Sequence, residues 1–550
     1  MKRIVLLLSA LLIMSSAFAQ RLTEQQAKER AASFLMSKRG TALAKGAGVK
    51  ASGLTTVSLG IDGVYVFNVD GGGYVVAGGD SRVAPVLGFG DNGTLNAADV
   101  PANMKAWLEG YARQAAFAAE NNLDYKVSSA SSDHEPIEPM LKTNWGQHEP
   151  FNRLCPLAYP DDPSKGRCVA GCVATAMAQV ANYHKWPVKA EGIGHATDLD
   201  DNSYEIDMSN DYFDWDNMLD VYTNEKKEIV AGNETQWDAV ALLIRDMAYC
   251  VNMTFSPKGS GATRNIIPFA MVNNLGYDKG AHAEYRDWYT DEEWDNMIYE
   301  NLSKYGPLIY CGATKDDEGH AFVCDGYRGD GYYHINWGWN GESNGYFLLS
   351  SLNPDHLDNE GIVKEYAFDY DQDAVFGLCK PREGSQAVVN VSVWTQLYVI
   401  NGDIACFLEY HVTQPEEIEI GVWTKDIDSE EEDYHFVEKT TIEEPTLDIA
   451  FPNNFELPDG EYKVRLTFRR AGEEEWRFVR CSRHYKNYLL LKVENGEKTF
   501  YTDEPTSVEG INAAGTPKDN RSYDLLGKPA TKSSNLRILI VNGKKVVKGK

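Results

Sequence analysis

The first candidate for chemistry in this 550-residue chain is a cysteine that directly follows a glycine. The segment from Val173 to Trp186 contains neither Gly nor Pro, so we expect a helix that Pro187 ends, with Cys172 in its first turn. Unpaired backbone N–H groups and the positive end of the helix dipole favour thiolate over thiol at that place. A thiolate is the form that a cysteine nucleophile requires.

A cysteine nucleophile also needs a base and a residue that orients the base. His320 opens a predicted strand 148 residues after Cys172, and Asn336 follows 16 residues later. Papain-type enzymes have their His and Asn roughly 130–150 residues beyond the Cys. His320 fits that spacing and Asn336 lies a little past it. The Asn336 carbonyl can hold the imidazole without neutralising it, which favours a thiolate–imidazolium pair.

Two further features bear on this hypothesis. Gln147 lies 25 residues before Cys172, where its amide could donate to an oxyanion alongside the Cys172 N–H. His334 competes with His320 as the base, but catalytic His and Asn must come from neighbouring strands, so we expect His334 to pack instead. Its expected neighbours are Tyr332, Trp337 and Trp339.

A lone Cys is usually a packing residue. For Cys172, the presence of His320, Asn336 and Gln147 at suitable spacings argues against a packing role.

The motifs around these residues resemble those of the streptopain family of papain-like cysteine peptidases. The segments that carry the resemblance are Gly171-Cys172-Val173-Ala174-Thr175-Ala176 with Ala178-Gln179, Tyr183-His184, Gly319-His320-Ala321-Phe322-Val323, Tyr333 to Trp339, Trp145-Gly146-Gln147 and Gly259-Ser260-Gly261-Ala262. The resemblance implies an endopeptidase acting on proteins and peptides, with Cys172 as nucleophile and His320 as base and acid. It further implies that Asn336 orients His320, that Trp337 shields their hydrogen bond, and that Gln147 lines the oxyanion hole.

The first 130 residues resemble the inhibitory propeptide of the same family, which implies a zymogen whose own propeptide is its inhibitor. Val66-Phe67-Asn68 and Gly78-Gly79-Asp80-Ser81-Arg82 carry this part of the resemblance. Cys168 departs from the family pattern, since it lies four residues before the nucleophile. A Cys155–Cys168 disulfide and oxidative blocking of Cys172 are both open outcomes.

The sequence divides into five segments by composition and periodicity. We expect a signal peptide at 1–19, an α+β propeptide at 20–134, a papain-like α+β domain at 135–382, a β-sandwich at 383–502, and a linker with a sorting-type tail at 503–550. In the propeptide we expect helices at Leu22–Met36 and Met104–Ala118 and a hairpin of Val64–Val69 with Tyr74–Ala77. The Ser-rich stretch from Lys126 to Pro139 reads as an exposed linker that holds the activation site.

The net charge and the targeting signals limit the classes of partner that we expect for this protein. With 81 acidic and 53 basic side chains the net charge is −28, which argues against nucleic-acid binding. The predicted signal peptide implies export, and the apolar stretch Ile4–Met14 is too short to span a bilayer. We therefore expect a secreted or outer-membrane-associated protein. The basic tail from Arg521 resembles type IX sorting signals, which makes that secretion machinery an expected partner.

The site requires neither a metal nor another cofactor. No His-Glu-x-x-His or Cys-x-x-Cys motif occurs in the sequence, so a zinc site is not expected. Two other functions remain open at this stage. The first is an inactive peptidase-like domain that only binds, and the second is a thiol acyltransferase on the same scaffold.

Overall fold

The computed structural model describes most of the chain between residues 21 and 501, and two short strands near its end. The described residues are 21–37, 50–120, 123, 134–224, 227–313, 319–350, 372–393, 397–400, 403–450, 454–482, 487–501, 538–541 and 544–547. The predicted signal peptide, residues 126–133 of the predicted activation linker and most of the predicted sorting tail lie outside them.

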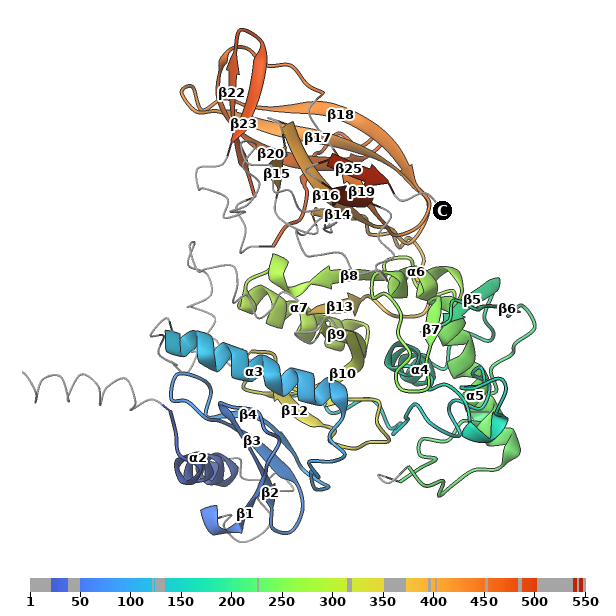
Figure 1. Ribbon diagram of the computed structural model, residues 1–550. Helices are drawn as coiled ribbons and strands as arrows, with labels where there is room; N and C mark the ends of the chain where they lie inside the picture. Colours follow the sequence, from blue (N-terminus) through green and yellow to red (C-terminus); the bar gives the residue numbers. More distant parts are fainter. Residues whose placement is uncertain are drawn as a thin grey trace, which may run out of the picture.

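A ten-stranded antiparallel sheet runs through the N-terminal and central parts of the molecule (Figure 1). Its strands are, in spatial order, β1 (Leu54–Val57), β2 (Val64–Val69), β3 (Tyr74–Gly78), β4 (Val86–Gly90), β12 (Gly345–Leu348), β11 (Tyr332–Asn336), β10 (Gly319–Gly329), β9 (Leu308–Ala313), β13 (Asp373–Phe376) and β8 (His282–Tyr285). The first four belong to the N-terminal part and the other six to the central part. The predicted propeptide therefore extends the sheet of the domain that it precedes.

The N-terminal elements confirm their local sequence signals. Strands β2 and β3 form the predicted hairpin, with Phe67 opposite Val75. Helix α2 (Glu24–Ser37) begins at a capping box, in which the Thr23 N–H donates to Gln26 Oε1 at 2.8 Å. Helix α3 (Ala102–Glu120) covers the predicted helical segment and buries Trp107.

The junction between the two parts is closed by one strand pairing and by aromatic packing. Strand β4 pairs with β12, where Phe89 lies opposite Tyr346. From α3, the Trp107 ring contacts the rings of Phe322 at 5.6 Å and Trp337 at 6.3 Å. Edge-to-face contacts of this kind stabilise beyond simple burial, so α3 holds the N-terminal part firmly over β10 and β11.

The central part places helices before its main strands, as predicted for α+β. The helices are α4 (Cys172–His184), α5 (Glu234–Cys250), α6 (Ile266–Asn273) and α7 (Asp291–Lys304), and a small sheet holds β5 (Ile193–Asp198), β6 (Ser203–Asp207) and β7 (Met253–Phe255). Helix α4 ends two residues before the predicted end, because Lys185 adopts a left-handed conformation with φ 47°. Strand β11 ends at Asn336 rather than continuing to Trp339, because Gly338 turns the chain with φ 72°.

The end of the predicted activation linker is part of the folded domain. Ile137 exchanges backbone hydrogen bonds with Tyr327, at 2.6 and 2.8 Å, and the Met140 N–H donates to the Asp325 carbonyl at 3.0 Å. The prediction of an exposed linker up to Pro139 is therefore wrong for these residues. Backbone pairing with β10 fixes the chain from Ile137 onward.

Beyond Pro381 two antiparallel sheets pack on a common core, as the strand pattern predicted. One sheet has β14 (Asn390–Val393), β15 (Tyr398–Ile400), β16 (Asp403–His411) and β19 (Thr446–Ala450). The other has β17 (Glu416–Asp426), β18 (Glu432–Ile442), β20 (Gly460–Arg470), β21 (Arg477–Phe478), β22 (Leu489–Glu494) and β23 (Glu497–Tyr501). Side chains from both sheets share one apolar cluster. In the tail, β24 (Ile538–Val541) and β25 (Lys544–Val547) form a hairpin.

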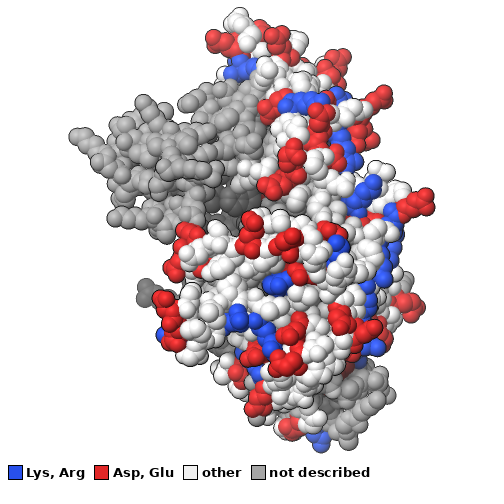
Figure 2. All heavy atoms as spheres, turned by 90° about the vertical axis from the view of Figure 1, so that its right-hand side faces the viewer, with Lys and Arg blue, Asp and Glu red and all other residues white. Residues whose placement is uncertain are grey.

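The surface carries charge of both signs. On the face in Figure 2, acidic and basic side chains are interspersed over the described residues. Among the described residues, no helix has both the length and the apolar character needed to span a membrane.

Candidate active site

Cys172 begins α4 at a point where the backbone is tightly enclosed. Gly171 precedes it with φ 91°, a conformation that favours glycine. A Cβ at Gly171 would lie 2.9 Å from Met253 Cε and 3.1 Å from the Ser260 carbonyl oxygen. The glycine before the nucleophile is therefore required both by its dihedral angle and by the segment packed against it.

The sulfur of Cys172 lies beside the start of β10. The Ala321 N–H donates to Cys172 Sγ at 3.4 Å, so the residue next to His320 touches the sulfur. Burial raises the pKa of the Cys172 thiol, and the N–H groups of Ala321 and Val173 and its own N–H only partly oppose this. In the full-length chain, burial therefore acts against the thiolate that the helix terminus favours.

His320 occupies the face of β10 opposite to the one that meets Cys172. Side chains alternate along a strand, and the register of β10 with β9 is regular from Gly319 to Cys324. Ala321 packs in the same apolar cluster as Cys172, whereas Phe322 packs with Trp107 on the α3 side. By this alternation His320 shares the face of Phe322, which α3 covers.

The side chain of Asn336 is fixed in a buried hydrogen-bond network. Its Nδ2 donates to the Thr143 carbonyl at 2.8 Å, and its Oδ1 accepts from Gln179 Nε2 at 3.3 Å and from the Gly338 N–H at 3.0 Å. Thr143 Oγ1 in turn donates to Gln179 Oε1 at 2.8 Å. In the β10–β11 register Asn336 lies opposite Val323, three residues from His320, so the two side chains are on opposite faces. The predicted His320–Asn336 bond is not among the bonds that Asn336 makes here.

Trp337 is fully buried at the same turn. Its Nε1 donates to the Ser343 carbonyl at 2.9 Å, and its ring packs against Phe322 at 4.8 Å. Asn103, from the first turn of α3, donates to the Trp337 carbonyl at 2.8 Å. The N-terminal part thus reaches into the site through a polar contact as well as through Trp107.

Gln147 is held near the nucleophile by its backbone. Its carbonyl accepts from the Ala170 N–H at 3.0 Å, two residues before Cys172. Its half-buried side-chain amide makes no hydrogen bond to the part of the chain that the structure describes. None of the described residues competes with a ligand for this amide, as an oxyanion donor requires.

Sequence reasoning missed three residues of the site and misjudged the neighbours of one more. Thr143, Gln179 and Asn103 make the contacts given above, and only Gln179 had a signal, since it lies within the nucleophile motif. His334 packs as predicted, but its neighbours are different: Nδ1 lies 2.6 Å from Asp325 Oδ1, and the ring packs on Tyr346.

The other thiols near the nucleophile are reduced and buried. Cys155 and Cys168 are both free, so the Cys155–Cys168 disulfide left open by the sequence does not exist in this structure. Three or more His, Cys, Asp or Glu side chains do not gather into a possible metal site anywhere in the described ranges.

Comparison with known proteins identifies the family of this chain. Residues 145–347 match the model of the peptidase C10 family, and residues 19–115 match that of the Spi protease inhibitor. The prointerpain A fragment of Prevotella intermedia is 31% identical in sequence, and the match covers 59% of this chain and 99% of the fragment, with a TM-score of 0.51. This chain belongs to the peptidase C10 family.

Two other relatives extend the comparison. Streptopain of Streptococcus pyogenes serotype M28 is 29% identical over 390 residues, covering 64% of this chain and 91% of streptopain. The thiol protease/hemagglutinin PrtT of Porphyromonas gingivalis is 31% identical over 408 residues, covering 69% of this chain but 44% of PrtT. The chain is thus a cysteine endopeptidase with a propeptide-like inhibitor domain, which makes the full-length form a zymogen.

Proposed function

We propose that this peptidase is secreted and activates itself, with Cys172 and His320 as its catalytic pair. The observation that carries the proposal is the hydrogen bond from the Ala321 N–H to Cys172 Sγ at 3.4 Å. A local rearrangement of the β10 backbone at His320, next to this contact, would bring the imidazole to the sulfur. Because α3 and Trp107 cover the face of β10 that carries His320, removal of residues 20–134 is the step that permits this change.

In the active form the Cys172 thiolate attacks the carbonyl carbon of a peptide bond. The oxyanion is bound by the Cys172 N–H and the Gln147 amide. The His320 imidazolium protonates the leaving amine, the C–N bond breaks, and an acyl-enzyme remains. His320 then takes a proton from water, the hydroxide attacks the thioester, and the acid leaves as the thiolate reforms. Asn336 orients His320, and Trp337 keeps water from their hydrogen bond.

Self-activation is tested with purified full-length protein. Cys172→Ala should stay full-length, whereas Cys168→Ala, which changes the neighbouring thiol, should convert to the processed form. Mass analysis over time reports both. Conversion of pure Cys172→Ala would contradict self-activation.

Hydrolysis rather than acyl transfer is the expected outcome of the acyl-enzyme. Asn336 and Trp337 beside the base favour attack by water, since transglutaminase-like enzymes more often orient the His with Asp. Processed protein is incubated with a peptide substrate and a primary amine, and the products are analysed by mass. Free acid as the main product supports the proposal, and predominant amide product favours the acyltransferase.

Export is proposed to use the signal peptide at 1–19 and the basic tail. The predicted cleavage site and the resemblance of residues 521–550 to type IX sorting signals support this. A chain that lacks residues 521–550 should accumulate in the periplasm of the producing cells. Unchanged release into the medium would show that the tail is not a sorting signal.

A further inference from the structure

The C-terminal β-sandwich is docked on the central part through polar contacts rather than hung from a free linker. In Figure 1 its lower strands, β14 and β16, lie directly above β8 and α6. Asn390 Nδ2 donates to Glu284 Oε1 at 2.9 Å, and Asn273 Nδ2 donates to the Thr413 carbonyl at 2.8 Å. One contact joins β14 to β8 and the other joins α6 to the segment after β16, so the sandwich is fastened at two separate points.

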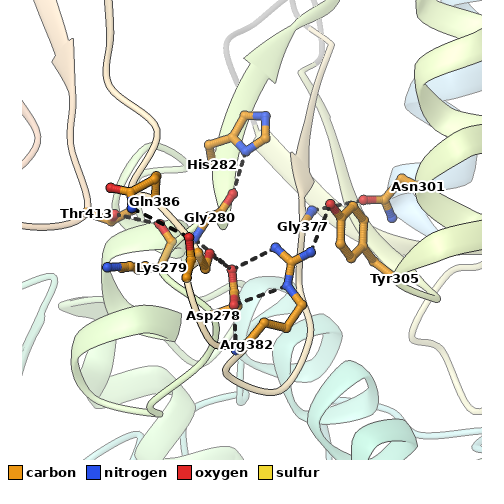
Figure 3. A network of polar contacts seen from close by, with 12 residues as sticks. Asp278, Lys279, Gly280, His282, Asn301, Tyr305, Gly377, Arg382, Gln386 and Thr413 are labelled. Carbon is orange, nitrogen blue, oxygen red and sulfur yellow. Dashed lines mark hydrogen bonds and ion pairs between the residues drawn. The ribbon is translucent and has the colours of Figure 1, made fainter.

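The connecting segment is fastened by one buried carboxylate (Figure 3). Asp278, 1% exposed, accepts from the backbone N–H of Arg382 at 2.8 Å and from Arg382 Nη2 at 3.0 Å. It also accepts from Ser385 Oγ at 2.5 Å and from the Gly280 N–H at 2.9 Å. Next to it, Thr413 Oγ1 of the sandwich donates to the Lys279 carbonyl at 3.4 Å. The linker between the domains therefore has a fixed path.

A second carboxylate reaches from the sandwich into the central part. Glu409 on β16 is 12% exposed and accepts from Asn265 Nδ2 at 3.3 Å and from the Tyr285 hydroxyl at 3.4 Å. Burial raises the pKa of Glu409, and the nearby positive charge of Arg264 partly opposes this. Arg264 Nη1 lies 2.5 Å from the buried carboxylate of Asp373. Arg264 thus has an acidic neighbour from each domain.

Arg264 and Asn265 end the segment that packs against the nucleophile. Ser260 Oγ donates to the Val169 carbonyl at 2.6 Å, and the Val169 N–H donates to the Ser256 carbonyl at 3.1 Å. The Ser260 carbonyl is the group that a Cβ at Gly171 would meet at 3.1 Å. The chain is continuous from this contact to the residues that Glu409 contacts, so a few residues link the sandwich to the segment that packs beside Gly171, next to Cys172.

We propose that the β-sandwich is a positioning domain of the peptidase, in which Glu409 holds residues 254–265 in place and so sets the affinity for peptide substrate. Glu409 is a positioning residue, because it acts through Arg264 and Asn265 and touches no reacting atom. The inference rests on the proposed function of Cys172. It predicts that the sandwich stays bound to the processed enzyme rather than being discarded.

The test compares processed full-chain variants by their steady-state constants on one peptide substrate. Glu409→Ala should raise KM about fivefold or more, as expected for lost hydrogen bonds to a buried carboxylate, and should leave kcat within about twofold. Glu409→Gln keeps an acceptor for Asn265 and Tyr285, so its KM should lie between those of the wild type and Glu409→Ala. The matched control is Glu419→Ala, because Glu419 pairs with Arg469 at 2.7 Å on β17 of the sandwich, and its KM should be unchanged. A KM for Glu409→Ala equal to that of the control overturns the proposal.

A second measurement does not depend on activity. In the Cys172→Ala background, peptides that cover residues 254–265 should exchange amide hydrogens faster in Glu409→Ala than in Glu419→Ala, with the sandwich strands equally protected in both. Equal exchange in this segment overturns the proposal. The two proposals can fail separately. If the segment exchanges faster in Glu409→Ala but a thiol-directed inhibitor never modifies Cys172 in the wild-type protein, Glu409 keeps its positioning role and the catalytic assignment of Cys172 is rejected.

Discussion

At the scale of single residues, Cys172, the proposed nucleophile, is a buried thiol in the full-length chain. Burial raises the pKa of Cys172, and a raised pKa means less thiolate at a given pH. The Ala321 N–H donates a hydrogen bond to the Cys172 sulfur, and His320 lies on the other face of β10. The helix terminus that favours a thiolate is present, but it acts on a desolvated group.

This state predicts a pH dependence for alkylation of Cys172. In a full-length precursor that carries His320→Ala, labelling by iodoacetamide should rise only above the ordinary thiol pKa of about 8.5. In the processed wild-type enzyme, the thiolate–imidazolium pair should already give labelling well below neutral pH. Rates measured from pH 5 to 10 by peptide mass decide between them. Equal rates at pH 6 would contradict the account.

A second residue-scale prediction concerns Gln179. Gln179→Leu removes the bond to Asn336 and leaves the Thr143 hydroxyl without its acceptor. The free energy of unfolding should fall by about 1–3 kcal/mol, measured by urea unfolding in the Cys172→Ala background. Gln25→Leu, at an exposed position on α2 that bonds only Glu29, should change it by less than about 0.5 kcal/mol. A smaller loss at Gln179 than at Gln25 would show that the network is not stabilising.

The types of the site residues could be read from the sequence, but their partners could not. Cys172 and His320 stand in motifs whose spacing points to them. The network of Asn336 depends on Thr143 and Gln179, which come from 193 and 157 residues earlier in the chain. No local pattern reports such contacts, so spacing and resemblance could suggest a His320–Asn336 bond but not the bonds that Asn336 makes here.

At the scale of elements, β4 pairs with β12 and α3 packs over β10, which joins the inhibitor-like domain to the peptidase domain. Gly88 lies opposite Phe347 in that pairing, where a Cβ would meet the ring at 2.4 Å. The strands can therefore approach only because a side chain is missing. Local signals such as the hairpin of β2 and β3 were predictable. The joining of two sheets into one was not, because strand pairing between distant segments leaves no local mark.

Replacement of Trp107 tests whether this junction keeps the peptidase inactive. Trp107→Ala removes the contacts with Phe322 and Trp337 and should cost about 3–5 kcal/mol of packing. Cys172 of the precursor should then react with a thiol reagent at least about tenfold faster, since each 1.4 kcal/mol is tenfold. Phe117→Ala on the same helix, whose apolar cluster contains Val83 and Ala118, should give little acceleration. Equal acceleration in both variants would mean that loss of prodomain stability, not the junction, is responsible.

At the scale of the whole molecule, three parts form a continuous body, since a shared sheet joins the first two and a polar interface joins the third. The sandwich was predictable from its strand pattern beyond Pro381. Its docking was not, because Asp278, Glu284 and Glu409 look like ordinary surface acids in the sequence. Only the fold brings their amide and guanidinium partners to them.

Asp278 gives this interface a defined dependence on pH. Against the cost of burial, bonds from Arg382 and Ser385 lower its pKa to about 2, from about 3.9 in an unfolded chain. A carboxyl whose pKa is lower in the folded than in the unfolded protein stabilises the fold when the pH is above the unfolded-state pKa. This stabilisation is about 2 kcal/mol at neutral pH, and it is lost as the pH falls through the folded-state pKa. Asp278→Asn should therefore be about 2 kcal/mol less stable at pH 7, with the difference shrinking between about pH 4 and pH 2.

Urea unfolding in the Cys172→Ala background measures that difference at each pH. Asp459→Asn is the control, since Asp459 accepts the backbone N–H groups of Asn495 and Gly496 in an exposed turn of the sandwich. If the loss at Asp278 is the same at pH 7 and at pH 2.5, the carboxylate charge is not what fastens the linker.

The central assignment of Cys172 is tested most directly by intact-mass analysis. Processed protein is treated with a thiol-directed epoxide inhibitor, with and without reductant, and activity is followed in parallel. We predict one adduct, located at Cys172 among the nine cysteines, with activity lost in step. The absence of an adduct at Cys172 in reduced, processed protein would contradict the assignment of Cys172 as the nucleophile.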